Sequence, residues 1–403
     1  MSKKRLLQID TCLGVGSTGR ITESIARLAQ EHGWECYIVH GARYVKRPSS
    51  MKDIQSVSKL GEYMHFAEGL LFDNHGLASR AATRRVVKQI MEIKPDVIQM
   101  HCIHGYYLNY KILFEYLNTT DIPVVWTFHD CWAFTGHCAH FVTAGCNKWK
   151  SGCFDCPLKG DYPKSFVDRS SRNYGIKKRL FSTNGNQHLV PVSNWMAGYV
   201  EQSFLGKKDI RVIKNGVDLG VFRPISREKV EKFRILGVSS VWNKDKGLFD
   251  FYRLRELLDH AGYEIVLVGL RADQMKDLPK GITGIEKTDS VEELVRLYSS
   301  SDVFVNPTYA DTFPTVNLEA LACGTPVITY KTGGSPEAVS LETGWVVEQG
   351  DTEEVARLIK ALADKPGNEI QEQRKACRKR AEQEFDQSRC FHKYLDLYES
   401  LVR

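Results

Sequence analysis

Five cysteines lie close together in the first half of the sequence, at spacings that could bind a metal ion. They are Cys131, Cys138, Cys146, Cys153 and Cys156, and the last two form a Cys-x-x-Cys pair. Four thiolates in tetrahedral geometry are a ligand set typical of structural zinc. We therefore predict a structural zinc held by Cys138, Cys146, Cys153 and Cys156, with reduced packing cysteines and redox or disulfide pairing as the alternatives. Four thiolates leave no open coordination position, so this metal is not expected to be catalytic.

A glycine-rich turn follows the first predicted strand. Gly14, Gly16 and Gly19 form the pattern Gly-x-Gly-x-x-Gly, which in dinucleotide-binding proteins places a helix N-terminus against a pyrophosphate. Those proteins also carry an acidic residue about 20 positions later, where this sequence has Val39-His40-Gly41. We therefore favour a turn that contacts another ligand over NAD(P) binding, and a purely structural turn is the third interpretation.

Two acidic residues, Asp311 and Glu319, stand eight positions apart in the second half. The segment that holds them follows an apolar run, and a helix is expected to begin near Thr315. Backbone amides at a helix N-terminus have no partner within the helix, so this loop combines carboxylates with free N–H donors. The alternative is a surface aspartate and a helical glutamate with no task.

The elements that must position these residues alternate along both halves of the chain. Short β-branched runs and longer helical patterns follow one another, which is typical of parallel sheets covered by helices. The predicted strands are 5–10, 35–40, 96–100, 123–128, 188–192, 233–238, 264–269, 302–306, 326–330 and 344–347. The predicted helices are 20–31, 82–93, 109–117, 174–181, 247–258, 291–298, 316–322 and 353–363, followed by terminal helices within 368–403. We predict an α/β protein with two doubly wound Rossmann-like domains, the first over 1–200 and the second over 201–385.

The composition is that of an ordinary globular protein, with 42% hydrophobic and 26% charged residues. No run of 18 apolar residues and no signal peptide is present, which favours a cytoplasmic protein. Charge is uneven, because residues 1–200 hold 25 Lys and Arg against 16 Asp and Glu, whereas the remainder holds 30 against 33. The basic first half predicts an anionic partner, with a solvated basic face as the alternative.

The segment 306–326 resembles the hallmark of family 4 glycosyltransferases, which are retaining enzymes of the GT-B fold. Asp311 and Glu319 match the two acidic positions of that hallmark, although the first is usually Glu. The chain also resembles bacterial polysaccharide-biosynthesis members of the family, because further markers occur in order over most of its length. These markers are Val192–Met196, Asn215–Asp218, Phe222, Pro224, Thr127–Asp130 and Gly333–Glu337, with Tyr394, Leu397 and Tyr398 in a closing helix.

This resemblance implies two domains facing across a cleft, with a C-terminal helix over 386–403 that returns to the first domain. It also implies that a sugar moves from a nucleotide diphosphate donor to an acceptor hydroxyl, with retention and without a catalytic metal. Glu319 would bind the ribose and Asp311 would lie by the donor sugar. The donor diphosphate would be held by Lys246 and by backbone amides, and His129 would contact the sugar. The residues expected to supply those amides or to line the donor site are Gly16, Lys244, Thr312, Phe313, Pro314 and Thr315.

One part of the family pattern is missing. The family commonly has an arginine before the diphosphate-binding lysine, and this sequence has none between Val238 and Lys246. Lys244 or Arg271 are candidates for the missing charge, and Trp242 is a candidate for stacking on a ring.

The basic first half fits an acceptor that carries a lipid pyrophosphate, and an anionic membrane surface. The basic residues that suggest this are Arg43, Lys46, Arg47, Lys164, Arg169, Arg172, Lys177, Lys178 and Arg179. Nucleic acid is not expected, because no aromatic stacking strip or nucleic-acid module is present. Two other functions stay open: a sugar-nucleotide isomerase of the same architecture, and a non-catalytic sugar-nucleotide sensor.

Overall fold

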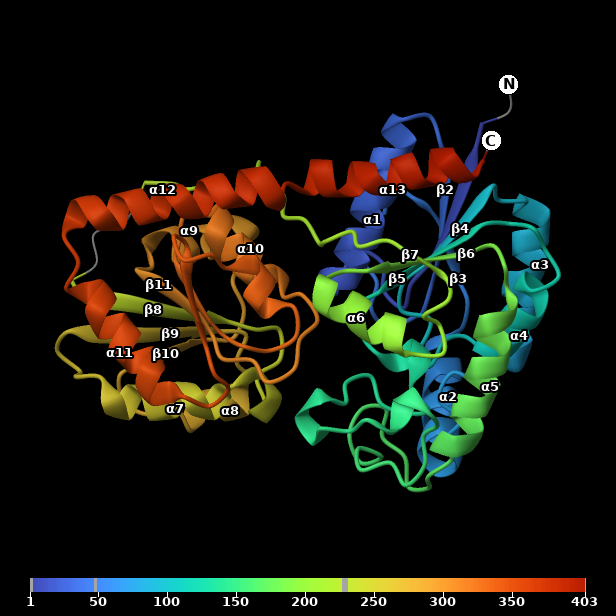
Figure 1. Ribbon diagram of the computed structural model, residues 1–403, viewed down its shortest axis with the longest axis horizontal. Coiled ribbons are helices and arrows are strands. Elements are labelled where there is room, and N and C mark those ends of the chain that lie inside the picture. The colour runs from blue at the N-terminus through green and yellow to red at the C-terminus, as the bar shows by residue number, and fades with distance from the viewer. Residues whose placement is uncertain (1–2, 47–48, 227–230, 403) are drawn as a thin grey trace. The chain divides into compact units, whose positions relative to one another are not determined.

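The computed structural model describes residues 3–46, 49–226 and 231–402 and divides into two compact units (Figure 1). Unit 1 comprises residues up to Ile213 together with Phe391 onwards, and unit 2 comprises Lys214–Cys390. Each unit is built around one parallel sheet covered by helices, which confirms the predicted α/β class with two doubly wound units. Arg47 of the predicted basic set lies outside the described residues.

Unit 1 contains a seven-stranded sheet in the order β3-β2-β1-β4-β5-β6-β7, with every neighbouring pair parallel. The strands are β1 (Arg5–Ile9), β2 (Glu35–His40), β3 (Lys52–Gln55), β4 (Val97–Met100), β5 (Val124–Phe128), β6 (Gln187–Pro191) and β7 (Asp209–Ile210). The helices are α1 (Gly16–Glu31), α2 (Lys59–Phe72), α3 (Arg80–Ile93), α4 (Tyr110–Leu117), α5 (Ser170–Thr183) and α6 (Asn194–Gln202).

Unit 2 contains a six-stranded parallel sheet in the order β10-β9-β8-β11-β12-β13. The strands are β8 (Phe233–Val238), β9 (Tyr263–Val268), β10 (Ile282–Ile285), β11 (Val303–Asn306), β12 (Val327–Tyr330) and β13 (Gly344–Val347). The helices are α7 (Leu248–Leu257), α8 (Ala272–Lys276), α9 (Val291–Ser300), α10 (Thr315–Ala322), α11 (Thr352–Ala363) and α12 (Gly367–Glu384), with 3-10 turns η4 (Lys244–Lys246) and η5 (Ser335–Ala338).

Both sheets reverse their strand order once, and the reversal defines where ligands are expected. In unit 1 the chain moves outward from β1 and returns beside it with β4; in unit 2 it moves outward from β8 and returns beside it with β11. In open α/β sheets the carboxyl ends of such a pair diverge and leave room for a ligand. The loops after β1 and β4, and those after β8 and β11, are therefore the structural candidates.

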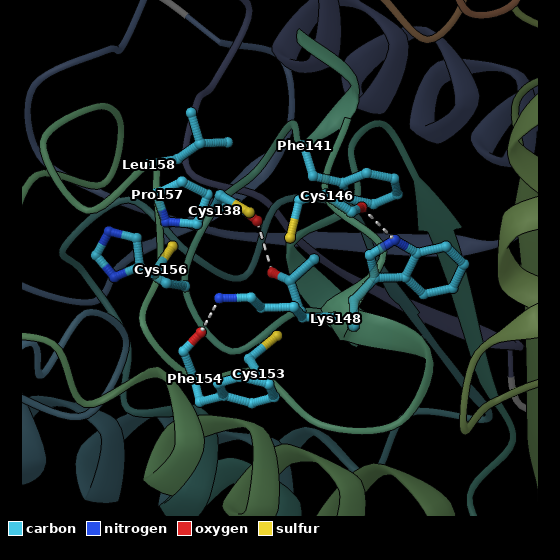
Figure 2. Close-up of a pocket in the computed structure, with 12 residues that line it drawn as sticks. Cys138, Phe141, Cys146, Lys148, Cys153, Phe154, Cys156, Pro157 and Leu158 are labelled. Carbon is cyan, nitrogen blue, oxygen red and sulfur yellow. Dashed lines mark hydrogen bonds between the residues drawn. The ribbon is translucent and has the colours of Figure 1, made fainter. Parts of the chain in front are cut away.

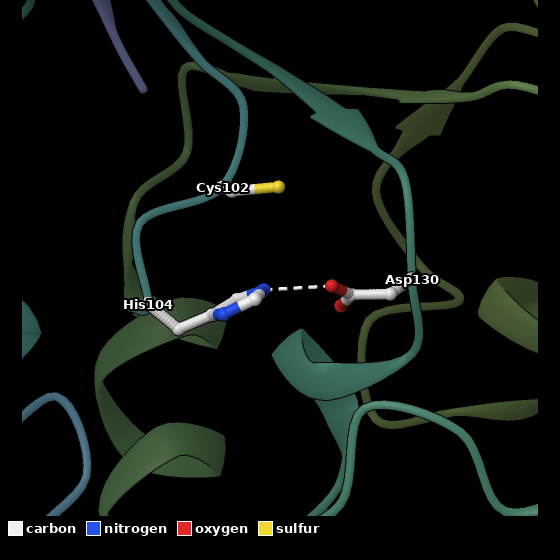
Figure 3. Close-up of side chains that lie close together, drawn as sticks. All are labelled: Cys102, His104 and Asp130. Atoms are coloured by element: carbon white, nitrogen blue, oxygen red, sulfur yellow. Dashed lines mark hydrogen bonds and ion pairs between the residues drawn. The ribbon is translucent and has the colours of Figure 1, made fainter. Parts of the chain in front are cut away.

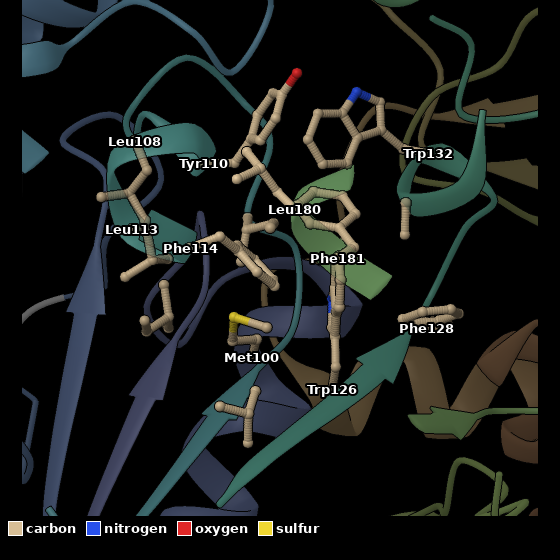
Figure 4. Packing of buried hydrophobic residues seen from close by; sticks show 14 of the residues in the cluster. Met100, Leu108, Tyr110, Leu113, Phe114, Trp126, Phe128, Trp132, Leu180 and Phe181 are labelled. Atoms are coloured by element: carbon tan, nitrogen blue, oxygen red, sulfur yellow. The ribbon is translucent and has the colours of Figure 1, made fainter. Parts of the chain in front are cut away.

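Aromatic side chains fill the core of unit 1 on one face of its sheet (Figure 4). Phe114 of α4 and Phe181 of α5 lie with ring centroids 4.3 Å apart, and both contact Trp126 of β5. Burial of such rings is the main favourable contribution to packing in a core of this kind. This core supports the ends of β4 and β5, where the candidate residues of unit 1 lie.

The C-terminal helix α13 (Gln387–Leu401) completes unit 1. Its Tyr394 hydroxyl lies 3.2 Å from Thr127 Oγ1 of β5, and its Tyr398 hydroxyl donates to Gln99 of β4. Tyr398 also packs edge-on against Trp34, beside β2. The predicted return of a terminal helix to the first unit is thus confirmed.

Several elements were not predicted, and α2 is the most instructive. Its buried residues are Glu62, His65 and Gly69, whereas Leu60 and Met64 are 69% and 65% exposed. The polar side chains face the protein because Glu62 pairs with Arg43, at 2.6 Å, and His65 accepts the Gly76 N–H. The usual rule that apolar residues mark the inner face of a helix therefore fails here.

Candidate active site

The acid-bearing loop of unit 2 joins β11 to α10, at the reversal of strand order. Pro314 occupies the N-cap position of α10 and no side chain caps the helix. The first-turn amides around Thr315 therefore keep their capacity to bind an anion, aided by the helix dipole. The sequence placed this helix start correctly.

Lys246 and Asp311 come from the two loops at this reversal and form an ion pair. Lys246 Nζ lies 2.7 Å from Asp311 Oδ2 and 3.2 Å from the Ala310 carbonyl oxygen. Both side chains are partly exposed, at 33% and 22%. The structure thus brings two of the predicted catalytic residues into contact, at a place that solvent reaches.

Two close approaches between backbones fix this arrangement. Gly247 has a φ of +71°, and a Cβ there would lie 2.3 Å from the Pro307 carbonyl oxygen. Gly333, with a φ of +55°, lies so near Asp311 that a Cβ would come within 1.7 Å of its carbonyl oxygen. Only glycine fits either position. Gly333 belongs to the family marker Gly333–Glu337, but its contact with Asp311 was not inferred from the sequence.

Glu319 lies in the second turn of α10 and is 6% exposed. Its Oε2 accepts a hydrogen bond from the hydroxyl of Tyr298, 3.1 Å away on α9. Tyr298 was missed because nothing in its sequence context links it to the acidic segment. The pair shows that the second acid is held from a neighbouring helix.

The remaining donor-side residues divide into buried and exposed ones. Phe313 and Thr312 are buried, and their carbonyl oxygens accept from the Asn215 side chain, at 3.1 Å, and from Gly334 N–H, at 3.0 Å. Lys244 is exposed on η4. The contacts of Thr312 and Phe313 hold the loop in position, and the side chains of these two residues are buried and do not face solvent.

One residue considered for the donor site near the missing arginine is corrected by the structure. Trp242 is 2% exposed and donates its Nε1–H to the Val268 carbonyl oxygen at 2.8 Å, so its ring is part of the core. Arg271 pairs with Asp273 at 2.8 Å. Lys244 and Arg271 both stay candidates for the additional charge.

In unit 1 the glycine turn lies between β1 and α1. The helix begins at Gly16, which has a φ of +68°, four residues before the predicted start. A Cβ on Gly16 would meet no atom within 4 Å, so its backbone conformation and not the available space requires glycine. No side chain caps α1, and its first amides form a second possible anion-binding position.

His129 follows β5 and pairs with His101, which follows β4. Their facing ring nitrogens lie 3.0 Å apart and the rings are stacked. Burial lowers the pKa of His129 to about 4. The predicted catalytic histidine is therefore neutral at physiological pH and suited to hydrogen bonding rather than to charge stabilisation.

A group that the sequence did not reveal lies beside this pair (Figure 3). His104 Nε2 is 2.6 Å from Asp130 Oδ2, and His104 Nδ1 is 3.0 Å from the Tyr162 hydroxyl. Burial acts to raise the pKa of Asp130, but the charge and hydrogen bond of His104 outweigh it and hold that pKa well below its ordinary value. The carboxylate thus orients the imidazole, which in turn contacts the hydroxyl of Tyr162, a residue that is 47% exposed as a whole.

The four cysteines predicted to bind zinc line one pocket in the segment between β5 and α5 (Figure 2). Lys177 of the predicted basic surface lies beside this segment and is 1% exposed, so that assignment was wrong for this residue. It is buried because its ammonium donates to the Trp132 and Thr135 carbonyl oxygens, at 2.6 and 3.0 Å, and lies over the Trp132 ring.

Two parallel α/β units with a terminal helix that returns to the first define the GT-B class of fold. Comparison with known proteins agrees with this class. Residues 18–221 match the family model described as Glycosyltransferase Family 4, and residues 232–365 match the model described as Glycosyl transferases group 1. The chain belongs to the family 4 glycosyltransferases.

Individual relatives cover nearly the whole chain. A putative colanic acid biosynthesis glycosyl transferase of Escherichia coli, WcaC, is 26% identical over 88% of this chain and 89% of its own length. Among solved structures, sucrose-phosphate synthase from Thermosynechococcus elongatus has a TM-score of 0.73 at 16% identity, over 99% of both chains. HepE of Anabaena in complex with UDP-glucose has a TM-score of 0.63 at 15% identity, over 98% of this chain and 99% of its own. These structures are similar in fold.

Proposed function

We propose that this glycosyltransferase moves a sugar, with retention of configuration, from a nucleotide diphosphate sugar to a hydroxyl of a lipid-linked saccharide in polysaccharide biosynthesis. The observation that carries the proposal is the Lys246–Asp311 ion pair beside the uncapped N-terminus of α10. A lysine and free amides at one strand-order reversal suit a diphosphate. The polysaccharide role is supported by the description of the Escherichia coli relative, and the donor class by the UDP-glucose complex of HepE.

The proposed step breaks the bond between the sugar's anomeric carbon and the phosphate oxygen. The diphosphate leaves with the electron pair, the acceptor oxygen bonds to the same face of the sugar, and its proton passes to the departing phosphate oxygen. Lys246 and the amides near Thr315 stabilise the charge that develops on the phosphate. Donor binding would draw the ammonium from Asp311, which frees the carboxylate for sugar hydroxyls. Glu319 binds the ribose, and neutral His129 contacts the sugar.

Incubation with UDP-, GDP- and ADP-sugars tests this proposal. We expect slow release of nucleoside diphosphate from one donor class without an acceptor, and NMR should show that the sugar is first released with the donor's anomeric configuration. Conversion to another sugar still attached to the nucleotide would favour the isomerase. Binding without turnover, with or without lipid-linked acceptors, would favour the sensor.

We further propose that unit 1 works at an anionic membrane surface. No helix in the described part of the chain is long and apolar enough to span a bilayer. On α2, however, Leu60, Tyr63, Met64 and Leu71 follow one another at helical spacing and are 69%, 58%, 65% and 49% exposed. Apolar side chains at this density on a surface helix are typical of interfacial binding.

Neighbouring residues extend this face and add positive charge. Phe166, 60% exposed, donates its backbone N–H to the Leu70 carbonyl oxygen at 2.8 Å, which places it beside the end of α2. The Arg43 guanidinium lies 5.5 Å from the Tyr63 ring centroid, with its charge paired to Glu62. Lys164 and Arg169 are close to Phe166 in sequence. A mixed apolar and basic face matches an anionic bilayer better than a neutral one.

Vesicle flotation tests the membrane proposal. Wild-type protein should float with vesicles of phosphatidylglycerol and phosphatidylcholine. The double variant Leu60→Glu, Met64→Glu should reduce the bound fraction about tenfold or more, because it removes two apolar side chains that would be buried in the bilayer. Phe249→Glu is the matched control, because Phe249 is 63% exposed on unit 2. Equal loss in the control, or equal binding to pure phosphatidylcholine, would contradict the proposal.

A further inference from the structure

The segment between β5 and α5 is long and has little regular structure to hold it. Within it the structure contains the 3-10 turns η1 (Trp132–Phe134), η2 (Val142–Ala144) and η3 (Lys148–Lys150). The segment nonetheless encloses a pocket of about 20 Å³, enough for one atom-sized occupant. A loop of this length without strands or long helices usually requires another source of order.

The four cysteine sulfurs line this pocket, and two neighbouring contacts already orient them (Figure 2). The thiols of Cys138 and Cys156 are within hydrogen-bonding reach of each other. Cys153 Sγ accepts the Gly136 N–H at 3.1 Å. An amide donor to sulfur stabilises a thiolate more than a thiol, since hydrogen bonds to ionised acceptors are the stronger ones.

Gly136 is essential to this packing. A Cβ on Gly136 would lie 2.2 Å from the Ser170 carbonyl oxygen and 2.7 Å from Cys153 Cβ. The absence of a side chain therefore allows Cys153 to approach the backbone that donates to it. The loop is built to bring Cys153 toward the pocket and not merely to bury it.

Two lysines flank the pocket without a carboxylate partner in the part of the chain that the structure describes. Lys177 is buried and donates to backbone carbonyl oxygens. Lys148 reaches between the cysteines in Figure 2 and donates to the Phe154 and Asp155 carbonyl oxygens, each at 3.0 Å. A buried cation without a carboxylate partner, as at Lys177, is costly, and a centre of four thiolates and one divalent ion carries two negative charges that would offset it.

We propose that Cys138, Cys146, Cys153 and Cys156 bind one zinc ion, each losing its proton to solvent. In the structure no three of these sulfurs yet lie within 4.8 Å of one another. Closure requires rotation about χ1, the single torsion that places each sulfur, and this torsion has three staggered positions. The filled site has no open coordination position, and its task is to order the segment between β5 and α5.

Another group of potential ligands is excluded by its own contacts. Among the described residues, Cys102, His104 and Asp130 do offer atoms within 4.8 Å of one another. Both ring nitrogens of His104 are occupied, however, by Asp130 and by the Tyr162 hydroxyl. A metal ion bound there would break one of these two hydrogen bonds. A metal ion bound by the four cysteines would break no hydrogen bond between a cysteine and a charged side chain.

Elemental analysis of protein purified under reducing conditions without chelators tests the zinc proposal. We expect about one zinc per chain, falling below about a tenth in Cys153→Ser and Cys146→Ser. Cys131→Ala is the matched control, because Cys131 lies in the same segment but does not line the pocket; it should keep its zinc. Folded wild-type protein without zinc would overturn the proposal, as would full zinc content in both serine variants.

Cobalt substitution keeps the proposal testable if the serine variants do not fold. Wild-type protein loaded with Co²⁺ should show the absorption bands of tetrahedral cobalt with four thiolates. A spectrum of octahedral cobalt with oxygen or nitrogen ligands would reject the assignment. A Cys138–Cys156 disulfide, detected as two missing thiols in a titration of freshly purified protein, would also reject it. None of these outcomes depends on the proposed sugar transfer.

Discussion

The loops at the two strand-order reversals occupy equivalent positions in their sheets but carry opposite chemistry. Between β8 and β11 the structure places a charged pair, Lys246 and Asp311, next to an uncapped helix. Between β1 and β4 it places buried titratable groups whose pKa values are shifted toward the neutral form: burial lowers the pKa of His101 well below its ordinary value and raises that of Asp10 to about 6. The same topology thus provides an ion pair beside an uncapped helix in unit 2 and, in unit 1, an uncapped helix beside a buried histidine suited to hydrogen bonds with hydroxyl groups.

Lys246→Ala should give the largest effect, because it removes the cation from the loops at the strand-order reversal between β8 and β11. We expect turnover to fall about 10²–10³-fold, the usual loss for one preorganised group that stabilises transition-state charge. Steady-state kinetics with saturating donor measures this, and Lys375→Ala, which changes an exposed lysine on α12, is the control. Unchanged turnover in a folded Lys246→Ala protein would remove the basis for distinguishing the two reversals.

Gly333→Ala should displace the loop that holds Asp311 without removing either charge of the Lys246–Asp311 pair. The new Cβ would collide with the Asp311 carbonyl oxygen, and the loop must shift. We expect turnover to fall about 10²-fold, which is typical of a displacement of about 1 Å in a catalytic group. Gly185→Ala, where a Cβ meets no atom within 4 Å, should behave like the wild type. Full activity of Gly333→Ala would show that the position of Asp311 is not critical.

Tyr162→Phe tests the loops at the strand-order reversal between β1 and β4 and should have the smallest effect. It removes the hydroxyl that pairs with His104 and leaves the exposed ring in place. If this reversal receives acceptor hydroxyls, the KM for the acceptor should rise about tenfold, the value of one hydrogen bond to a preorganised group. The affinity for nucleoside diphosphate, measured by calorimetry, should not change. A loss of nucleotide affinity instead would mean that the two reversals do not divide the substrates in this way.

Residues next to strands and helix starts were predictable, because alternation of elements fixes where loops end. The loop that holds Asp311 and Glu319 was found in this way, and the helix start at Thr315 is correct. Lys246 and the roles of the two acids came from the resemblance to the family. The contacts of Tyr298 and Gly333 with the two acids were not predicted, because these residues reach the site from other elements and their roles depend on tertiary contacts. Helix α2 was not predicted, and its apolar residues could not have identified its buried face, because most of them are exposed and polar residues face the protein. Trp242 and Lys177 show the opposite error. Both were predicted to face a ligand or partner because of their residue type, but both are buried.

The return of α13 to unit 1 has a consequence for how the protein is made. Unit 2 is one continuous stretch of chain, whereas unit 1 is assembled from both ends. During synthesis from the N-terminus, residues up to Ile213 leave the ribosome before Tyr394 and Tyr398 have been made. Thr127 and Gln99 therefore lack their contacts with these two hydroxyls until α13 is translated. Of the two units, the one whose translation begins first is therefore completed last, and the surface that α13 covers stays uncovered until that helix has been translated.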